Sequence, residues 1–443
     1  MLLVKSLHTL QHLMLNALKI AIIIGFNLIM PQKPLPLKQA IFNRRMLICM
    51  ATGFASGLPL YILIQLVPAW LRDQGIGLKE IGLFSLITFP YTWKFIWSPL
   101  MDRYSLPFLG LRRGWILLTQ VAVMLCVAAL GLFNPTEGLQ PIVFLVGAVA
   151  FFSASQDIVI DAYRRELLPD NELGLGTSIH ANAYRVAGLI PGSLSLILAD
   201  ILPWKSVFFI TALFMLVGII MTLMIAELEH KHQPATLTDA VVKPFIEFFT
   251  RDGVRQALWI LSFMFLYKLG DNLATALSTP FYLDLGFTKT QIGLVAKNAA
   301  LWPAVIGGLI GGILMLRIGI NRALWLFGGV QILSILGFVI LAKAGAVVWV
   351  LAAVISVEYL GAGLGTAAFL AFIAKNASKS HTATQLALLT AVTAIPRTFA
   401  NATTGYIVEA VGWEDFFYIC TLCAIPGMLV LFKVAPWNKP VKQ

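Results

Sequence analysis

Two aspartates lie one helical turn apart on an otherwise apolar segment. Asp157 and Asp161 stand in the run Ser-Ala-Ser-Gln-Asp-Ile-Val-Ile-Asp-Ala. A carboxylate at the centre of a bilayer costs about 2.5–3.5 kcal/mol on helix-insertion scales, so each must face a partner or a water-filled cavity. The pair indicates a transport pathway with a proton or substrate site. Asp157 is the preferred residue, because Asp161 lies nearer to Arg164 and Arg165 and is expected to form a salt bridge.

Other ionisable residues interrupt apolar segments later in the chain. Lys268 and Asp271 are spaced i,i+3, so the lysine can neutralise the acid on one face of a helix. The pair is either a structural contact or a switch, in which a proton or substrate competes for one partner. Glu358 precedes Gly361, Gly363 and Gly365, where small residues permit close helix contact beside a buried acid. Proton coupling is therefore assigned to these candidates: Asp157, Asp161, Asp271 and Glu358.

Two arginines and two lysines complete the set of charges within apolar segments, namely Arg185, Arg397, Lys94 and Lys297. Arg185 and Arg397 occupy similar positions in the two halves of the chain and are expected to flank a central cavity. The alternative is that each pairs with a neighbouring helix and serves assembly. Lys94 is expected near a membrane boundary, where its long side chain can reach water.

The composition indicates a membrane protein. Hydrophobic residues make up 59% of the chain and charged residues only 12%, against about 25% charged residues in soluble domains. The net charge of +11 comes from lysines and arginines scattered over short turns rather than from a dense basic run. This distribution argues against nucleic-acid binding and is typical of residues that orient a membrane protein.

Apolar runs of about 20 residues predict twelve transmembrane helices. They are expected at 46–67, 80–100, 114–133, 139–162, 174–200, 204–226, 256–283, 290–315, 323–343, 346–374, 384–410 and 414–434. Lysine and arginine gather in the termini and in every second connection. Both termini are therefore predicted to be cytoplasmic. The fold class is an all-α integral membrane protein with two pseudo-symmetric six-helix bundles.

The long polar connection after the sixth span divides the chain. The predicted units are a cytoplasmic N-terminal segment 1–45, an N-terminal bundle 46–226, a linker 227–255 with an interfacial helix, a C-terminal bundle 256–434 and a cytoplasmic tail 435–443. The apolar run 17–30 is too short to span and lacks a signal-peptide cleavage site. We expect Met30 to be the natural start, so a chain beginning there should insert and transport. The alternative is an amphipathic surface helix.

A short turn is repeated after the second helix of each half. Ser98-Pro-Leu-Met-Asp-Arg103 aligns with Gly312-Ile-Leu-Met-Leu-Arg-Ile-Gly319, which suggests a duplicated chain. The turn resembles the G-x-L-x-D-R-x-G-R-R loop of the major facilitator superfamily, although Leu316 replaces the acid in the second copy. The resemblance implies a cytoplasmic gate in the first half and a weakened one in the second. Its expected residues are Asp102, Arg103, Arg112, Arg113 and Arg317.

A wider set of motifs resembles the AmpG-type muropeptide permeases of that superfamily. The stretches that carry the resemblance are GFASGLPL at 53–60, WKFIWSPLMDRY at 93–104, RRGW at 112–115, SASQDIVIDA at 153–162, Tyr184–Arg185, YKLGD at 267–271 and ATQLALL at 383–389. It implies proton-driven import of GlcNAc-1,6-anhydroMurNAc-peptides across the bacterial inner membrane, for peptidoglycan recycling and β-lactamase induction. The implied partners are this substrate, protons and the bilayer, with a monomeric chain and no cofactor.

Such substrates carry carboxylates, amides and hydroxyls, which call for cations and amide side chains. The candidate binding residues are Gln156, Asn182, Arg185, Lys268, Lys297, Asn298, Gln385 and Arg397. Alternative cargoes for the same fold are a siderophore, a peptide, an acetyl-CoA-like anion or a drug. A sensor or membrane enzyme is the lesser alternative, because the sequence contains no metal cluster, nucleophile motif, phosphate loop or soluble signalling domain.

Overall fold

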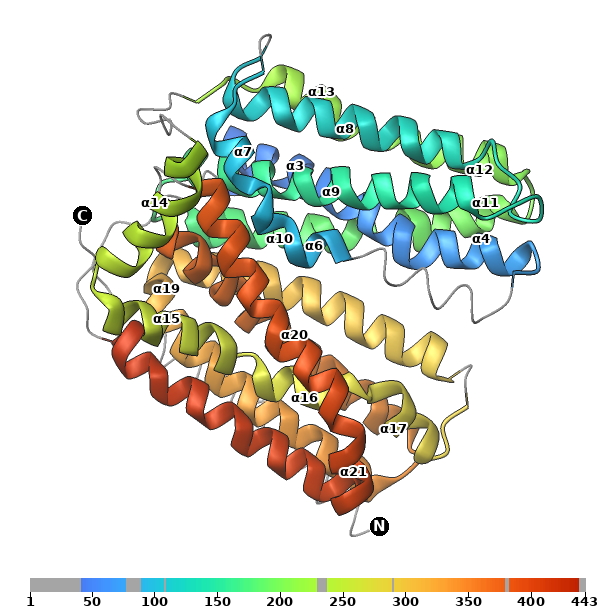
Figure 1. Ribbon diagram of the computed structural model, residues 1–443. Helices are drawn as coiled ribbons and strands as arrows, with labels where there is room; N and C mark the ends of the chain where they lie inside the picture. The colour runs from blue at the N-terminus through green and yellow to red at the C-terminus, as the bar shows by residue number, and fades with distance from the viewer. Residues whose placement is uncertain are drawn as a thin grey trace.

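The computed structural model describes residues 41–76, 89–106, 109–228, 237–288, 291–378 and 382–437, and the helices in these ranges form two bundles (Figure 1). Apolar helices satisfy their own backbone hydrogen bonds, which the bilayer interior requires. Throughout the described ranges the regular elements are helices, as predicted, and no strand is present.

The first bundle contains the helices up to residue 224. They are α3 (Arg44–Tyr61), η1 (Ile62–Leu66), α4 (Val67–Asp73), α6 (Phe89–Trp93), η3 (Lys94–Ile96), α7 (Ser98–Arg103), α8 (Leu111–Leu130), α9 (Gln140–Leu167), α10 (Leu173–Ala187), η4 (Ile190–Leu194), α11 (Ser195–Ala199), α12 (Trp204–Leu213) and α13 (Leu216–Met224). The connection to the second bundle contains α14 (Leu237–Thr250).

The second bundle consists of fewer, longer elements. They are α15 (Val254–Leu266), α16 (Leu269–Ala276), α17 (Ser278–Asp284), η5 (Ile292–Ala296), α19 (Lys297–Ala344), α20 (Val348–Asn376) and α21 (Thr382–Val434). Both α19 and α21 contain a sharp turn, at Gly319 with φ 76° and at Gly412 with φ 78°. Positive φ is open to glycine without the steric cost of a Cβ, so each of these elements comprises two consecutive helices.

Seven helices in the described part of the chain are long and apolar enough to cross a membrane. Two of them, α19 and the end of α21, come from the merged elements, and further spans are divided by π-helical or 3₁₀ segments. The start of the second predicted span falls in 77–88, outside the described residues, as does the N-terminal segment 1–40. The number twelve therefore stays a prediction.

The two halves share a structural detail that supports duplication. Trp204 at the start of α12 donates its indole N–H to Asp73 at the end of α4, at 2.7 Å. In the second half, Trp413 donates to Asp284 at the end of α17, at 2.9 Å. A glycine with positive φ follows each aspartate, Gly75 at 82° and Gly286 at 93°. The same tryptophan–aspartate clasp thus closes equivalent ends of the two bundles.

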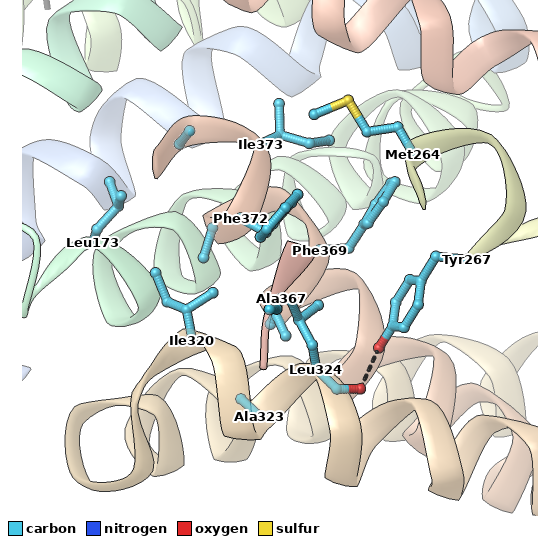
Figure 2. Close-up of a cluster of buried hydrophobic side chains, with 14 of the residues drawn as sticks. Leu173, Met264, Tyr267, Ile320, Ala323, Leu324, Ala367, Phe369, Phe372 and Ile373 are labelled. Atoms are coloured by element: carbon cyan, nitrogen blue, oxygen red, sulfur yellow. Dashed lines mark hydrogen bonds between the residues drawn. The ribbon is translucent and has the colours of Figure 1, made fainter. Parts of the chain in front are cut away.

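Buried side chains join the bundles as well as filling them. One cluster contains Phe369 and Phe372 of α20 with Tyr267, and it extends to Leu173 of α10 in the first bundle (Figure 2). The hydroxyl of Tyr267 donates to the carbonyl oxygen of Leu324 at 3.0 Å, so this buried polar group is satisfied. The cluster is therefore an apolar contact between the halves.

The contact between the bundles is concentrated at one end of the molecule. The start of α21 packs against α7, η3 and α9, and α14 packs against α7 and α21. We call this the linker end; the ends of α4 and α17 lie at the far end (Figure 1). Phe248 of α14 is buried in the shared cluster, whereas Val241 and Val242 are exposed.

Candidate transport pathway

Asp157 is held in the first bundle by a hydroxyl and a cation. Its side chain is buried, and Ser56 of α3 donates to the carboxylate. Lys94 of η3 is also buried, at 8% exposure. Of the charged groups, it has the strongest electrostatic interaction with Asp157. Lys94 therefore packs within the protein and does not extend along the surface to water, while its depth in the membrane stays a prediction. Asp161 instead bonds Arg164 at 2.8 Å.

The polar face of α9 is anchored to the helices around it. Tyr91 donates to the hydroxyl of Ser153 at 2.7 Å, and Trp97 donates to that of Ser155 at 2.9 Å. The amide nitrogen of Gln156 donates to the carbonyl oxygen of Ala55 at 2.9 Å, while its Oε1 has no partner among the described residues. In this conformation Gln156 joins α9 to α3.

The second bundle contains a compact group of charged side chains. Nζ of Lys268 lies 2.6 Å from Oδ2 of Asp271, as their spacing predicted. Glu358 of α20 is fully buried. Of the charged groups, Asp271 has the strongest electrostatic interaction with its carboxylate. A cavity of about 10 Å³, close to the space of one water molecule, adjoins Asp271 and Gln331.

Arg185 and Asn182 lie on α10 where the two bundles meet. Arg185 donates to the carbonyl oxygen of Ala304 in α19 at 3.1 Å. Ser178 donates to the carbonyl of Gly308, and Asn182 packs beside Gly308 without a hydrogen-bond partner among the described residues. These side chains therefore pack between helices here, and a substrate could reach them only after the halves separate.

Three further residues were predicted to bind substrate. Asn298 is exposed at the start of α19. The side chains of Lys297 and Arg397 lie outside the described residues, so the predicted pairing of Arg185 with Arg397 around a cavity stays a prediction. The spacing of Lys268 and Asp271 thus predicted their contact, but nothing in the sequence indicated that Glu358 acts on Asp271.

Asp102 connects the two bundles at the linker end. Its Oδ1 accepts from Arg112 at 2.9 Å, and its Oδ2 accepts from the backbone N–H and the hydroxyl of Thr384 at 2.8 and 2.7 Å. Thr384 lies in the first turn of α21, where backbone N–H groups lack helical partners and the helix dipole favours an anion. Asp102 therefore caps a helix of the other bundle.

The arginines of the predicted gate have unequal environments. Arg112 also forms a salt bridge with Glu166 at 2.7 Å, and only 3% of its side chain is exposed. Arg113 donates from its side chain to carbonyl oxygens at the end of α13, and Arg103 lies over the ring of Tyr104 at 5.3 Å. In the second copy of the turn Arg317 is exposed.

The second copy of the turn lacks an acidic cap. Met315, just before Leu316, contacts Gly174 in the first turn of α10, so an apolar contact replaces the aspartate cap. This is the asymmetry that the replacement of the acid by leucine led us to expect.

Gln385 lies at the linker end, away from the central charges. Its Oε1 accepts from Arg251 at 3.0 Å and from the N–H of Ser378 at 2.6 Å. Its Nε2 donates to the carbonyl oxygen of Pro244 at 2.9 Å and to Glu247 at 2.5 Å. The structure therefore places Gln385 in a contact between α14 and α21 instead of beside Arg185.

Replacing Gln385 with alanine is expected to loosen α14. The change removes the hydrogen bonds from Gln385 to the carbonyl oxygen of Pro244 and from the N–H of Ser378, each worth about 0.5–1.5 kcal/mol. Limited trypsin digestion should then cut after Arg251, which is exposed at the end of α14, faster than in the unmodified protein. Gln140→Ala, at an exposed position of the far end, is the matched control. Equal cleavage rates in all three proteins would contradict the role of Gln385.

Comparison with known proteins decides the family. Residues 49–401 match the Major Facilitator Superfamily. The chain belongs to this superfamily. Among solved superfamily structures, the outward conformation of FucP superposes with a TM-score of 0.69 at 13% identity, covering 89% of this chain and 99% of that one. The human organic anion transporter MFSD10 superposes with a TM-score of 0.66 at 14% identity, covering 88% and 99%.

Relatives at higher identity bear out the resemblance to AmpG-type permeases. The anhydromuropeptide permease of Escherichia coli K12 is 40% identical over 390 residues, covering 87% of this chain and 79% of the relative. The putative transporter AmpG 4 of Rickettsia felis is 31% identical over 390 residues, covering 86% and 94%. An uncharacterized Haemophilus influenzae protein is 51% identical over 412 residues, covering 90% and 96%. This superfamily member is therefore a multi-pass membrane transporter and not an enzyme.

Several residues of the site were missed at the sequence level. Thr384 was read only as the start of an apolar span, although a threonine at the beginning of a helix is a capping signal. Ser56 lies within an apolar, glycine-rich stretch, and nothing local in the sequence marks it as the partner of Asp157. Glu247 and Arg251 have i,i+4 spacing that predicts their salt bridge, at 2.5 Å, but not their contact with Gln385.

Proposed function

We propose that this protein imports anhydromuropeptides from the periplasm into the cytoplasm of a bacterium, driven by the proton gradient. The 40% identity to the E. coli anhydromuropeptide permease, over most of both chains, is the observation that carries the proposal. Import of a polar substrate accounts for the many buried polar side chains on the membrane helices. The imported wall fragments would serve peptidoglycan recycling and β-lactamase induction.

The orientation of the protein follows from its charges. The linker end carries a group of arginines: Arg44, Arg45, Arg103, Arg112, Arg113, Arg164, Arg165, Arg251 and Arg255. The described part of the far end carries Arg72, Lys205 and Lys343. The excess of positive charge marks the cytoplasmic side of an inner-membrane protein. The linker end is therefore cytoplasmic in this proposal.

The described conformation is closed on the cytoplasmic side. Asp102 binds the first turn of α21, and Ser178 and Arg185 bind carbonyl oxygens of α19, so the bundles are joined from the linker end to the middle. Import then requires these contacts to break while others form at the far end. Arg185 and Asn182, released from the packed interface, would face the peptide carboxylates and sugar amides of the substrate.

Substrate counterflow in proteoliposomes tests the assignment without requiring a proton gradient. Vesicles loaded with unlabelled GlcNAc-1,6-anhydroMurNAc-tripeptide should take up the same labelled compound from outside. An excess of external anhydromuropeptide should abolish the signal, whereas a ferric siderophore, an acetyl-CoA-like anion or a plain tripeptide should leave it unchanged. Labelled uptake no greater than in vesicles without protein, or uptake that unlabelled anhydromuropeptide does not abolish, would contradict this cargo.

A further inference from the structure

Glu358 is a buried acid with little to stabilise an ionised carboxylate: Ser334 and Lys268 act on it more weakly than burial and the nearby charge of Asp271. Its side chain is fully buried in the middle of α20, and no described residue donates a hydrogen bond to either carboxylate oxygen. An ionised carboxylate in such a place loses its hydration without compensation, which costs several kcal/mol even after relaxation. A neutral carboxylic acid avoids this cost. The surroundings of Glu358 therefore favour a bound proton in this conformation.

The neighbouring carboxylate of Asp271 offers an acceptor for that proton. Oδ2 of Asp271 is held by Lys268 at 2.6 Å, whereas Oδ1 has no hydrogen-bond partner among the described residues. Asp271 is also the charged group with the largest effect on Glu358. Two carboxylates and one ammonium carry a net negative charge when both acids are ionised, and one added proton neutralises the group. That proton supplies the donor that the unpaired oxygens lack.

We propose that Glu358 and Asp271 share a single proton beside Lys268, and that this proton is the one coupled to transport. The inference rests on the proposed function and names the acid that carries the proton. Glu358 is the principal binding residue, because Asp271 already has a cation to balance its charge. The two acids titrate as one unit, so the bound proton belongs to the pair.

The other polar groups around the pair come from all the helices packed against it. Those that act on Glu358 or Asp271 are Lys268 beside α16, Tyr267 at the end of α15, Tyr282 of α17, Ser334 of α19, Cys420 of α21 and Arg185 of α10. Lys268 and Arg185 are the cations in this set. Lys268 is committed to Asp271, and Arg185 belongs to the opposite bundle.

Arg185 provides the link between the proton and the movement of the halves. It acts on Asp271 from across the interface and donates to Ala304 of α19 in the closed contact. Separation of the halves, or a substrate carboxylate that binds Arg185, removes positive charge from the vicinity of Asp271. Among the described side chains, Lys268 is then the cation left beside the pair, and the affinity of the pair for its proton changes between states. Such a difference between two states is the requirement for coupling.

Asp157 is a weaker candidate for the same role. Ser56 donates to its carboxylate, and Lys94 is the strongest charge acting on it. A donor and a cation nearby offset part of the cost of burying its carboxylate, so its surroundings call for a bound proton less strongly than those of Glu358. Asp157 serves to hold α3, η3 and α9 together.

Replacing Glu358 with glutamine tests the inference, because the amide imitates the protonated acid in size and charge. In proteoliposomes the variant should lose proton-driven accumulation of labelled anhydromuropeptide at least tenfold, and it should retain counterflow. Glu409→Gln is the matched control, since Glu409 is an exposed acid on α21 and should behave like the unmodified protein. Retained counterflow separates this result from failure of the proposed function, in which no variant would show counterflow.

Two results would overturn the assignment. One is full proton-driven accumulation by a folded Glu358→Gln protein, and another is selective loss of accumulation in Asp157→Asn alone. Infrared spectroscopy of the unmodified protein gives a test that does not depend on a variant folding. A buried, protonated carboxyl band should be present at neutral pH and should change when anhydromuropeptide binds. The absence of such a band contradicts the shared proton directly.

Discussion

Asp102→Asn is expected to slow transport about tenfold or more while the protein stays folded. Its carboxylate accepts hydrogen bonds from Arg112, from the N–H of Thr384 and from the hydroxyl of Thr384, at 2.7–2.9 Å. Hydrogen bonds to a charged group contribute about 1.5–3 kcal/mol each. Asparagine keeps one acceptor oxygen and directs an NH₂ group toward existing donors. The closed state therefore loses stability relative to the state that is open on the linker side.

Folding should survive because the buried Arg112 keeps a second acid. Glu166 lies 2.7 Å from its guanidinium and can balance the charge when Asp102 is neutral. A shift of about 1.4 kcal/mol changes the ratio of the two conformations tenfold. The carrier would then be mostly in the state that is open on the linker side. The state closed on that side would be less populated, and the transport cycle would slow.

Cysteine accessibility measures this shift independently of transport. Ala387 of α21 is buried against the first bundle at the linker end, so Ala387→Cys in a cysteine-free background reports separation of the halves. Asp102→Asn should raise the alkylation rate of this cysteine. Asp252→Asn, an exposed acid at the same end, should not. Unchanged alkylation together with normal uptake in Asp102→Asn would rule out a gating role for the contact between Asp102 and α21.

Gly57→Ala is expected to destabilise the protein by forcing two packed helices apart. A Cβ at this position in α3 would lie 2.4 Å from the carbonyl oxygen and 2.8 Å from the Cα of Tyr184 in α10. Both are backbone atoms, so the two helices must separate to relieve the clash. Overpacking of this kind costs about 1–3 kcal/mol and occasionally more. We expect a fall of several degrees in the Tm of the detergent-solubilised protein.

Gly147→Ala separates the steric effect from the change of residue type. Gly147 lies in α9, and a Cβ there meets no atom within 4 Å. Alanine at an open helical position should hold or raise stability, since it loses less backbone entropy than glycine on folding. If both variants melt at the same temperature as the unmodified protein, close packing of α3 on α10 does not limit stability.

Much of this fold could be predicted because the bilayer restricts the choices. Apolar runs of span length must be helical, and the alternation of basic connections orders them in the membrane. The spacing of Lys268 and Asp271 was enough to predict their salt bridge, since i,i+3 neighbours share a helix face. Local periodicity also explains the salt bridge of Asp161 with Arg164. In each of these cases the partners lie within one turn of one helix.

Contacts between distant helices account for what could not be predicted. Nothing near Glu358 in sequence shows that Asp271 is its neighbour, because the two acids lie on α16 and α20 and meet only through packing. The same holds for Gln385, whose four hydrogen-bond partners include residues of α14. Lys94 lies buried in a 3₁₀ turn within the second predicted span, which hydropathy alone does not reveal.

Uptake of labelled GlcNAc-1,6-anhydroMurNAc-tripeptide into proteoliposomes under an imposed proton gradient tests the central claim. With the outside acidic, the protein should accumulate the compound above the external concentration, and an uncoupler should return it to equilibrium. Accumulation should also rise with an inside-negative potential, which contributes about 2.3 kcal/mol per charge at 100 mV. Uptake no greater than in vesicles without protein, or accumulation that an uncoupler leaves unchanged, would contradict proton-driven import.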